Sequence, residues 1–114
     1  MADCLFCKMA AGEIPVRKIC ENEHVFVIDD INPAARVHAL IITKRHFDSL
    51  PSVGDGDGAV MDGIRRGALE AARIKGVDVS GFRMIANCGA DAGQTVPHLH
   101  FHILGGQFLG SKIL

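Results

Sequence analysis

The sequence contains no tryptophan, no tyrosine and no long run of apolar residues. A membrane-spanning helix needs about 20 consecutive apolar residues, so the sequence predicts no membrane partner of that kind. Any aromatic pocket must be built from the six phenylalanines. The formal net charge is only −1, and without a basic surplus nothing in the composition points to nucleic acid or an anionic membrane surface as a partner.

The length and composition predict one globular domain covering residues 1–114. The chain has 114 residues, of which 48% are hydrophobic and 22% are charged, values typical of a folded protein and not of a disordered one. The first residues lack the charged and then apolar pattern of a secretory signal, so we expect a cytoplasmic protein. In that reducing compartment the four cysteines need not form disulfides.

Hydrophobic patterning predicts an α+β domain in which an antiparallel sheet of about five strands packs against one main helix. A shorter helix of one or two turns is expected over residues 5–11. The expected strands, rich in β-branched and apolar residues, cover residues 17–21, 25–28, 37–43, 82–88 and 98–104.

The main helix is predicted over residues 55–75, where apolar residues recur at helical spacing. Asp55 or Asp57 is the expected N-cap, because a carboxylate accepts hydrogen bonds from the free N–H groups of the first turn. Gly76 suits the position just after the helix, where a positive φ is common. This helix is expected to cover one face of the sheet.

Three histidines in five positions are the most unusual feature of the sequence. In a strand over residues 98–104, His98, His100 and His102 lie on one face and apolar residues on the other, so the imidazoles should line an exposed or cleft-forming face. A merely solvated face would not need histidine. One metal ion shared by all three is disfavoured, since the outer pair would lie about 13 Å apart along the strand. Different histidines are therefore expected to have different roles.

Acid–base and nucleophilic chemistry at phosphorus is the third interpretation of this strand. A neutral imidazole is a good nucleophile, and its ordinary pKa of about 6.5 keeps much of it neutral near pH 7. Just upstream, Gly93, Gln94 and Thr95 offer a close backbone approach, an amide and a hydroxyl, all of which suit a phosphate. The sequence thus predicts a phosphate site next to the histidines.

These residues resemble the histidine-triad (HIT) superfamily, whose signature alternates three histidines with apolar residues. The likeness extends over roughly residues 4 to 106 and is closest to the Hint branch. Four further segments match that branch in order and spacing: residues 12–15, 30–33, 43–46 and 93–97. The resemblance implies a HIT-like fold, whose sheet continues across a homodimer, and an enzyme acting at a nucleoside 5′-phosphate.

The resemblance also implies which residues carry the chemistry. His100 would attack the α-phosphorus and form a nucleotidyl-histidine intermediate, with its ring oriented by a backbone carbonyl of the signature. His102 would bind a phosphate oxygen. His38 matches a histidine in the hydrogen-bond chain to the triad, although taken alone it would be assigned to the core.

Substrate-binding residues follow from the same resemblance. Asp30 matches the carboxylate that binds both ribose hydroxyls, although on sequence alone a turn residue is the simpler interpretation. Asn87 joins the loop of Gly93, Gln94 and Thr95 around the phosphate. The apolar walls of the base pocket are implied to be Leu5, Phe6, Met9, Ile28 and Ile31.

The pair Cys4 and Cys7 forms a C-x-x-C motif, which is one half of a typical zinc site. His46 and His98 are the candidates for the other half. Many bacterial Hint-like proteins carry this combination, so the resemblance implies a structural Zn²⁺ held by all four residues. With no open position, that ion would tie the N-terminal segment 1–12 to the sheet and would not catalyse. No organic cofactor is expected.

The leading functional hypothesis is a purine nucleoside phosphoramidase, or a related nucleotide hydrolase that releases a nucleoside monophosphate. Hydrolysis of dinucleoside polyphosphates or of adenylyl-sulfate type substrates is the alternative within enzymes. The alternative from another class is a nucleotide-binding or scaffolding protein with incidental turnover. The tail over residues 107–114 lacks a tryptophan that some Hint proteins have there, which leaves the leaving-group preference open.

Overall fold

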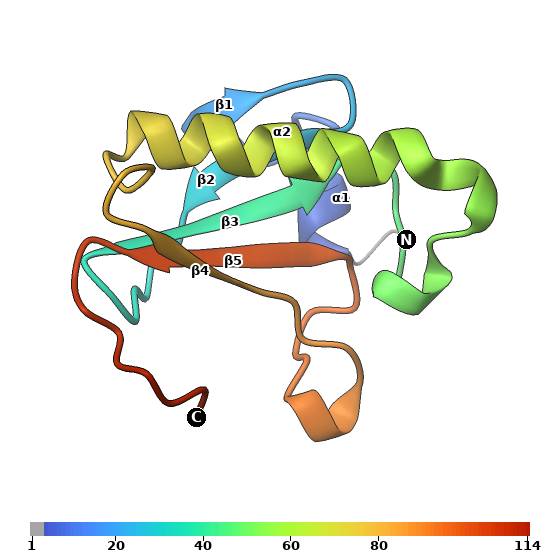
Figure 1. The fold of residues 1–114 in the computed structure, drawn as a ribbon. Helices are drawn as coiled ribbons and strands as arrows, with labels where there is room; N and C mark the ends of the chain where they lie inside the picture. Colours follow the sequence, from blue (N-terminus) through green and yellow to red (C-terminus); the bar gives the residue numbers. More distant parts are fainter. Residues whose placement is uncertain (1–3) are drawn as a thin grey trace.

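The computed structural model describes residues 4–114, so residues 1–3 of the predicted N-terminal segment lie outside the described part. The chain folds as the predicted α+β domain, with a five-stranded antiparallel sheet and one long helix (Figure 1). Its helices and strands are α1 Leu5–Ala10, β1 Lys18–Glu21, β2 Val25–Asp29, β3 Val37–Thr43, α2 Gly58–Ile74, β4 Phe82–Ile85 and β5 His100–Gly105. Three short 3₁₀ helices cover Leu50–Ser52, Asp55–Asp57 and Ala90–Ala92.

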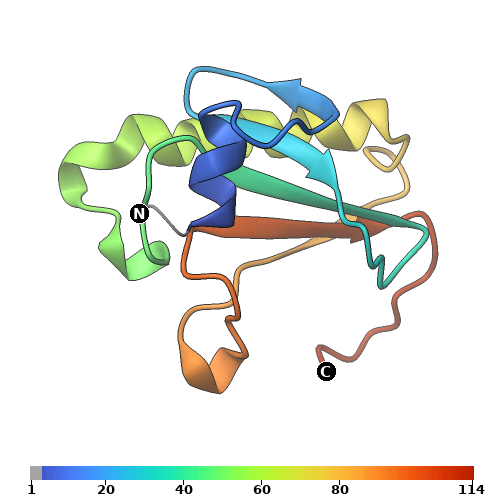
Figure 2. The ribbon, with the colours of Figure 1, turned by 180° about the vertical axis from the view of Figure 1, so that it is seen from behind.

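The two α-helices lie on opposite faces of the sheet. The strand order is β1-β2-β3-β5-β4, so β3 is the central strand. Helix α2 runs across one face (Figure 1), and the view from behind shows α1 against the other (Figure 2). This explains why Val25, Phe26, Val27 and Ile28 are all buried, as expected of a strand covered on both sides.

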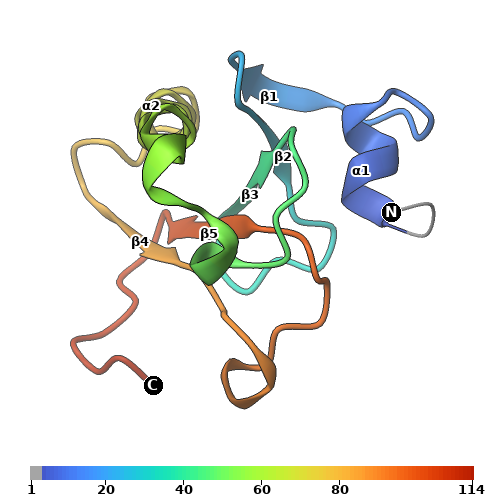
Figure 3. The same cartoon turned by 90° about the vertical axis from the view of Figure 1, so that its right-hand side faces the viewer.

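The main core lies between α2 and the sheet. The view along α2 shows the helix next to this face of the sheet (Figure 3). Leu99 and Ile103 belong to this core, and Phe101 packs against it, so the apolar residues next to the histidines face α2. The histidines are thereby turned toward the other face. A second apolar cluster on that face joins Phe6 of α1 to residues of β2 and β3.

Two glycines let α2 approach the sheet closely. A methyl group on Gly67 would lie 2.8 Å from Cγ2 of Val25, and one on Gly63 would lie 2.6 Å from Cβ of His24. Both distances are below any normal carbon–carbon contact. The close packing of α2 on β2 therefore depends on the absence of side chains at these two positions.

The structure corrects three predicted boundaries. The long helix begins at Gly58, and the Asp57 carboxylate makes no capping bond to it because it accepts from the Gly54 N–H and from Arg45. Strand β4 ends at Ile85, where its pairing with β5 stops, instead of at residue 88. Strand β5 begins at His100, so residues 98 and 99 precede it.

The prediction for the residue that follows α2 is confirmed. Gly76 follows α2 with a φ of +74°. All four cysteines are free thiols. Over residues 4–114, no helix combines the length and the apolar character that crossing a bilayer would require.

Candidate active site and metal centre

Two cysteines and two histidines from distant parts of the chain meet beside α1. Cys4 and Cys7 lie at the start of α1, His46 follows β3, and His98 precedes β5. One ligand atom from each lies within 4.8 Å of the other three, which is close enough to bind a metal. The structure thus brings together the whole predicted ligand set.

The ring orientations in this cluster leave one free nitrogen on each histidine. Nε2 of His98 lies 2.7 Å from the carbonyl oxygen of Thr43, and Nε2 of His46 lies 2.8 Å from a carboxylate oxygen of Asp48. Because both oxygens only accept, both Nε2 atoms carry the proton. Each Nδ1 is then an unprotonated nitrogen facing the cysteine sulfurs, as metal coordination requires.

The distances in the cluster fit a tetrahedral ion. Nδ1 of His98 lies 3.2 Å from the sulfur of Cys4 and 3.5 Å from that of Cys7, and Nδ1 of His46 lies 3.2 Å from the sulfur of Cys7. Around a tetrahedral zinc with bonds of about 2.3 Å to sulfur and about 2.1 Å to nitrogen, such pairs lie about 3.6 Å apart. A slight expansion would therefore admit the ion.

The chemistry of the two thiols also suits a cation. Burial and the adjacent Cys4 raise the pKa of Cys7. Burial opposes ionisation of Cys4 as well, but hydrogen bonds, above all from the Cys7 amide, lower its pKa overall. One thiolate thus disfavours the other, and a metal ion supplies the charge that allows both to ionise.

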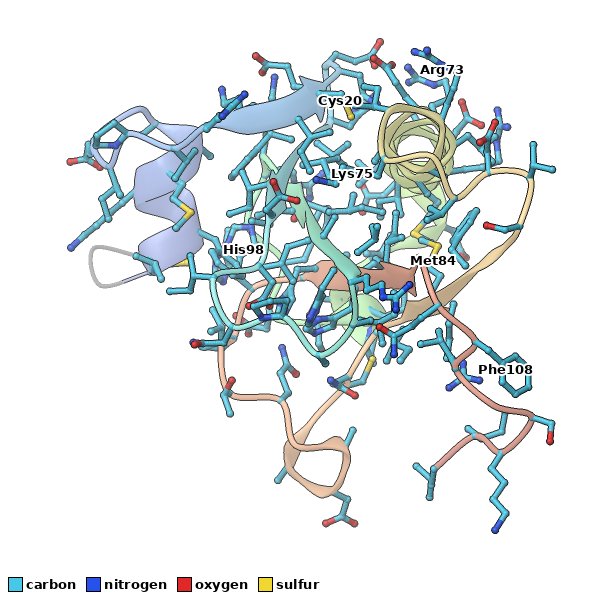
Figure 4. The ribbon with its side chains drawn as sticks, turned by 90° about the vertical axis from the view of Figure 1, so that its left-hand side faces the viewer. Cys20, Arg73, Lys75, Met84, His98 and Phe108 are labelled. Carbon is cyan, nitrogen blue, oxygen red and sulfur yellow. The ribbon has the colours of Figure 1, made fainter. Side chains whose placement is uncertain are left out.

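His98 is wholly buried, which corrects the prediction that all three imidazoles line an exposed or cleft-forming face. Its ring is enclosed between α1 and the sheet, in the interior of the molecule (Figure 4). Burial lowers the pKa of His98 below its ordinary value. His100 and His102, by contrast, are half-buried.

His100 has one nitrogen held by the backbone. Its Nδ1 lies 2.6 Å from the carbonyl oxygen of His98, so Nδ1 carries the proton and donates it. In the neutral ring Nε2 is then unprotonated and has its lone pair available. The ring also lies edge-on to Phe6, with 5.1 Å between ring centroids.

His102 has the opposite arrangement, because His38 donates a hydrogen bond to it. The backbone N–H of Ala34 donates to Nδ1 of His38 at 2.9 Å, so the proton of the neutral His38 ring lies on Nε2. That nitrogen is 2.9 Å from Nδ1 of His102 and 3.4 Å from a carboxylate oxygen of Asp30. His102 consequently carries its own proton on Nε2 and presents an N–H donor.

Asp30, His38 and His102 also lie close enough together to hold a metal ion, but the contact between the two rings is a hydrogen bond. The ring centroids are 5.1 Å apart, which is close to the 2.9 Å nitrogen–nitrogen distance plus the two ring radii. The two nitrogens therefore face each other nearly in a straight line, with a proton between them. Asp30 also accepts from the Asn32 N–H at 2.8 Å, so it is a turn residue as well as a neighbour of His38.

The loop before β5 is ordered by Gln94. Its side-chain N–H groups donate to the carbonyl oxygens of Asp48 and Val96 at 2.7 and 3.1 Å, and its side-chain oxygen accepts from the Gly89 N–H. The Gln94 side chain thus has no donor to spare for a phosphate. Thr95, by contrast, is exposed.

Only part of the predicted base pocket comes together. Phe6 and Ile28 belong to one buried cluster, and Met9 packs against it. Phe6 is only 5% exposed, so little of its ring is open to a base. Leu5 and Ile31 are exposed outside this cluster, Ile31 by 92%.

A cavity of about 390 Å³ borders the site on the β4 side. It is lined by Asn87 and His102, together with Arg83 and the last two residues of the tail. A larger hollow of about 650 Å³ lies between residues 76–83 and the start of the tail and includes none of the predicted site residues. The tail itself extends away from the sheet, with Phe108 89% exposed (Figure 4).

The structure adds one residue to the candidate metal centre that sequence reasoning did not find. The Asp48 carboxylate holds the ring of His46 and, with the hydrogen bond as the main cause, raises the pKa of His46. The signal in the sequence was a carboxylate two residues after a candidate ligand. The backbone carbonyl of Asp48 also accepts from the Gln94 side chain, so residues 46–48 connect the candidate metal centre to the loop.

Comparisons with known proteins identify the family. The family model described as "Scavenger mRNA decapping enzyme C-term binding" matches residues 3–113. A 13.2 kDa HIT-like protein of Azospirillum brasilense is 39% identical over 110 residues, covering 96% of this chain and 90% of that protein. Protein HitA of Neisseria gonorrhoeae is 40% identical over 105 residues, with coverage of 92% and 97%. The chain belongs to the histidine-triad superfamily.

Solved structures lead to the same family. A HIT family hydrolase from Clostridium thermocellum superposes with a TM-score of 0.96 at 43% identity, covering 100% of this chain and 99% of that one. A HIT family hydrolase from Legionella pneumophila gives 0.90 at 37% identity, with coverage of 96% and 97%. These relatives support a hydrolase in general.

Proposed function

We propose that this protein hydrolyses purine nucleoside 5′-phosphoramidates, or related nucleotides, at the α-phosphorus. The observation that carries the proposal is that two neighbouring histidines carry their protons on opposite ring nitrogens. His100 presents a bare nitrogen, because its other nitrogen donates to the carbonyl of His98 at 2.6 Å. His102 presents an N–H, because its other nitrogen accepts from His38. One attacking atom beside one phosphate-oxygen donor is the pairing that phosphoryl transfer needs.

The reaction would proceed in two displacements. Nε2 of His100 attacks the α-phosphorus, the bond from phosphorus to the leaving nitrogen breaks, and that nitrogen takes up a proton from solvent to leave as the amine. Water then attacks the same phosphorus and returns a proton to solvent, and the bond to His100 breaks, which releases the nucleoside monophosphate and restores the ring. In both steps the N–H of His102 stabilises negative charge on a phosphate oxygen.

The neutral state of His102 is maintained by its surroundings. Burial, with nearby His100 and His38, keeps the pKa of His102 below its ordinary value. A neutral ring with its donor fixed toward the site still binds a phosphate oxygen. His38 is therefore a positioning residue, since it determines which nitrogen of His102 carries the proton.

We assign nucleotide contacts to the residues that have free polar groups. Asp30 is 18% exposed at its side chain and would accept from the ribose hydroxyls. Asn87 and Thr95, with the backbone at Gly93, would contact the phosphate. Gln94 would act by ordering the loop, since its side chain is already fully hydrogen-bonded.

We infer that the cluster of Cys4, Cys7, His46 and His98 holds Zn²⁺. Two sulfur and two nitrogen donors at these distances suit zinc, which takes four such ligands in structural sites. When bound, the ion supplies a fixed crosslink between α1, the segment after β3 and the approach to β5. No position would remain for a substrate or an activated water.

The cavity next to His102 supports the alternative substrate class, the dinucleoside polyphosphates. Arg83 lines that cavity with Asn87 and His102, and within the described chain it has no carboxylate partner within ion-pair distance. Its guanidinium donates to the carbonyl of Gly110 at 2.9 Å. A cation beyond the α-phosphate site would favour a leaving group that carries further phosphates.

We also propose that the protein forms a homodimer through β4 and α2. Strand β4 is an edge of the sheet, and beside it an apolar groove of about 250 Å³ runs along α2. Leu69 and Met84 in this groove are 52% and 39% exposed. Light scattering should give twice the monomer mass of 12.2 kDa, and a monomer at micromolar concentration would contradict this.

The test of the function is phosphorus NMR with adenosine 5′-phosphoramidate. The wild-type protein should produce AMP and His100→Ala should produce none. The matched control His24→Ala, at a side chain that packs against α2, should keep the wild-type rate. A base-quenched sample should contain the nucleotidyl adduct in intact-protein mass spectra. AMP from His100→Ala would refute the assigned nucleophile. No AMP from wild type, with AMP binding retained, would support a nucleotide-binding protein instead.

A further inference from the structure

We propose that His98 and Phe6 are positioning residues that couple the metal cluster to the nucleophile His100. The inference rests on the proposed function for the identity of the nucleophile. It assigns to the metal cluster an effect on the reaction, in addition to the anchoring of the N-terminal segment. Two separate contacts carry it, one through the backbone and one through an aromatic ring.

The backbone contact is the carbonyl of His98. The His98 ring is wholly buried and is held at both nitrogens, by the Thr43 carbonyl on one side and by the cluster on the other. Its own carbonyl accepts from Nδ1 of His100 at 2.6 Å. Since β5 begins only at His100, the anchored ring of His98 helps to fix where that carbonyl lies. The Leu99 N–H, which donates to the Phe47 carbonyl at 2.7 Å, holds the same peptide from its other side. A ligand of the cluster therefore carries the carbonyl that sets the tautomer of the nucleophile.

The ring contact is Phe6. It lies in α1 between the two cysteines and meets both His98 and His100 edge-on, at centroid distances of 5.7 and 5.1 Å. Helix α1 has only six residues, a length that does not hold a helical conformation by itself in water. The position of the Phe6 ring against His100 thus depends on what ties Cys4 and Cys7 to the sheet.

The two contacts act on different properties of His100. The carbonyl of His98 keeps the proton on Nδ1 and so leaves Nε2 able to attack. The Phe6 ring limits rotation of the imidazole. If the cluster is opened, His100 should sample the other tautomer, in which Nε2 carries the proton and cannot attack phosphorus. Turnover should then fall, while the groups that bind ribose and phosphate stay in place.

The first experiment uses one protein in two states. The purified chain is treated with a zinc chelator and then reloaded with ZnCl₂, and the folded fraction is confirmed by circular dichroism well below the melting temperature. Long-range ¹H–¹⁵N spectra, assigned with His100→Asn, report the His100 tautomer. We expect the Nδ1–H form with zinc, a mixture of tautomers without it, and a kcat lower by about 10- to 100-fold. AMP affinity should stay within about two-fold of the loaded protein.

Two variants keep the test decisive if the chelated protein unfolds. Phe6→Leu keeps all four ligands and should bind one zinc, yet show lower kcat and broadened His100 signals. Cys20→Ser alters a thiol on β1 outside the cluster and should change neither kcat nor the His100 signals. A zinc-free folded protein, or a folded Phe6→Leu protein, with wild-type His100 spectra and kcat would overturn the proposal.

Failure of the proposed function would give a different pattern. If the wild-type protein does not release AMP, the tautomer still reports whether the cluster controls His100. Spectra that respond to zinc without turnover would uphold the positioning and refute the reaction. Turnover that responds to zinc without any change in the His100 spectra would refute the positioning alone.

Discussion

Two groups of side chains in this molecule each contain two histidines, one of which belongs to the signature. In the metal cluster the histidines are joined by two cysteines, and in the relay of Asp30, His38 and His102 they are joined by a carboxylate. They differ in where the nitrogens point. In the metal cluster, two unprotonated nitrogens face two sulfurs around a common centre. In the relay, two nitrogens face each other across one proton. The role of each histidine is thus set by the group that holds its far nitrogen.

Removing the metal should produce the largest difference between the two groups, because only the metal cluster depends on the ion. Chelation, or Cys4→Ser with Cys7→Ser, should lower the melting temperature by about 10 °C or more, because a structural ion contributes several kcal/mol to a small domain. Elemental analysis should show one zinc per chain before treatment. A metal-free wild-type protein with an unchanged melting temperature would refute the zinc site.

Breaking the relay should reduce activity and leave zinc in place. His38→Phe keeps a ring of similar shape but donates no hydrogen bond to His102, so the proton of His102 is no longer directed to one nitrogen. We expect kcat to fall by about 100-fold, within the usual range for acid–base and orienting groups. The measurement is steady-state AMP release with zinc content, and His24→Phe is the control. Full activity in a folded His38→Phe protein would show that the relay is only structural.

The two carboxylates beside the histidines allow a sharper separation. Asp48→Asn should weaken zinc binding by about 10-fold or more, because the carboxylate holds the ring of His46, with little effect on AMP affinity. Asp30→Asn should weaken AMP binding and have little effect on zinc binding. Competition with a zinc indicator and calorimetry with AMP measure both quantities. Equal effects of the two variants on both ligands would mean that the two clusters are not independent.

The smallest expected effect is on the pH dependence of stability. Because the pKa of His102 is lowered in the folded protein, protonation favours unfolding. Stability from this group is present above the ordinary pKa of about 6.5 and is lost as the pH falls through the folded value. The melting temperature should therefore decline from pH 7 to pH 5, less steeply in His102→Asn. Identical slopes would exclude His102 as a contributor.

Much of the fold was predictable from the sequence, because strand and helix periodicity is a local property. The seven main elements lie where the pattern placed them, within a few residues. The boundary errors share one cause, since they depend on partners that the pattern does not show. Asp57 binds Gly54 and Arg45 and leaves the helix uncapped, and the pairing of β4 ends where the chain turns toward Asn87.

The candidate site was predictable as a set of residues but not as a set of orientations. Spacing suggested that the histidines differ in role, yet it did not show that His98 is buried under α1. Phe6 was expected in a base pocket, and its edge-on contacts with two histidines could not be foreseen. Gln94 was expected at the phosphate, and the hydrogen bonds by which its side chain orders the loop could not be foreseen. Such assignments depend on which of several available partners a side chain meets in three dimensions.

The glycines of α2 have a consequence for how the molecule folds. Each interior glycine costs a helix about 1 kcal/mol relative to alanine, and α2 contains two that the sheet requires to be free of side chains. At 17 residues, a helix with this handicap has little intrinsic stability as a separate peptide. The segment therefore gains its helical structure together with β2 and β3, which makes folding cooperative. A synthetic peptide spanning residues 55–76 should be mostly random coil in water.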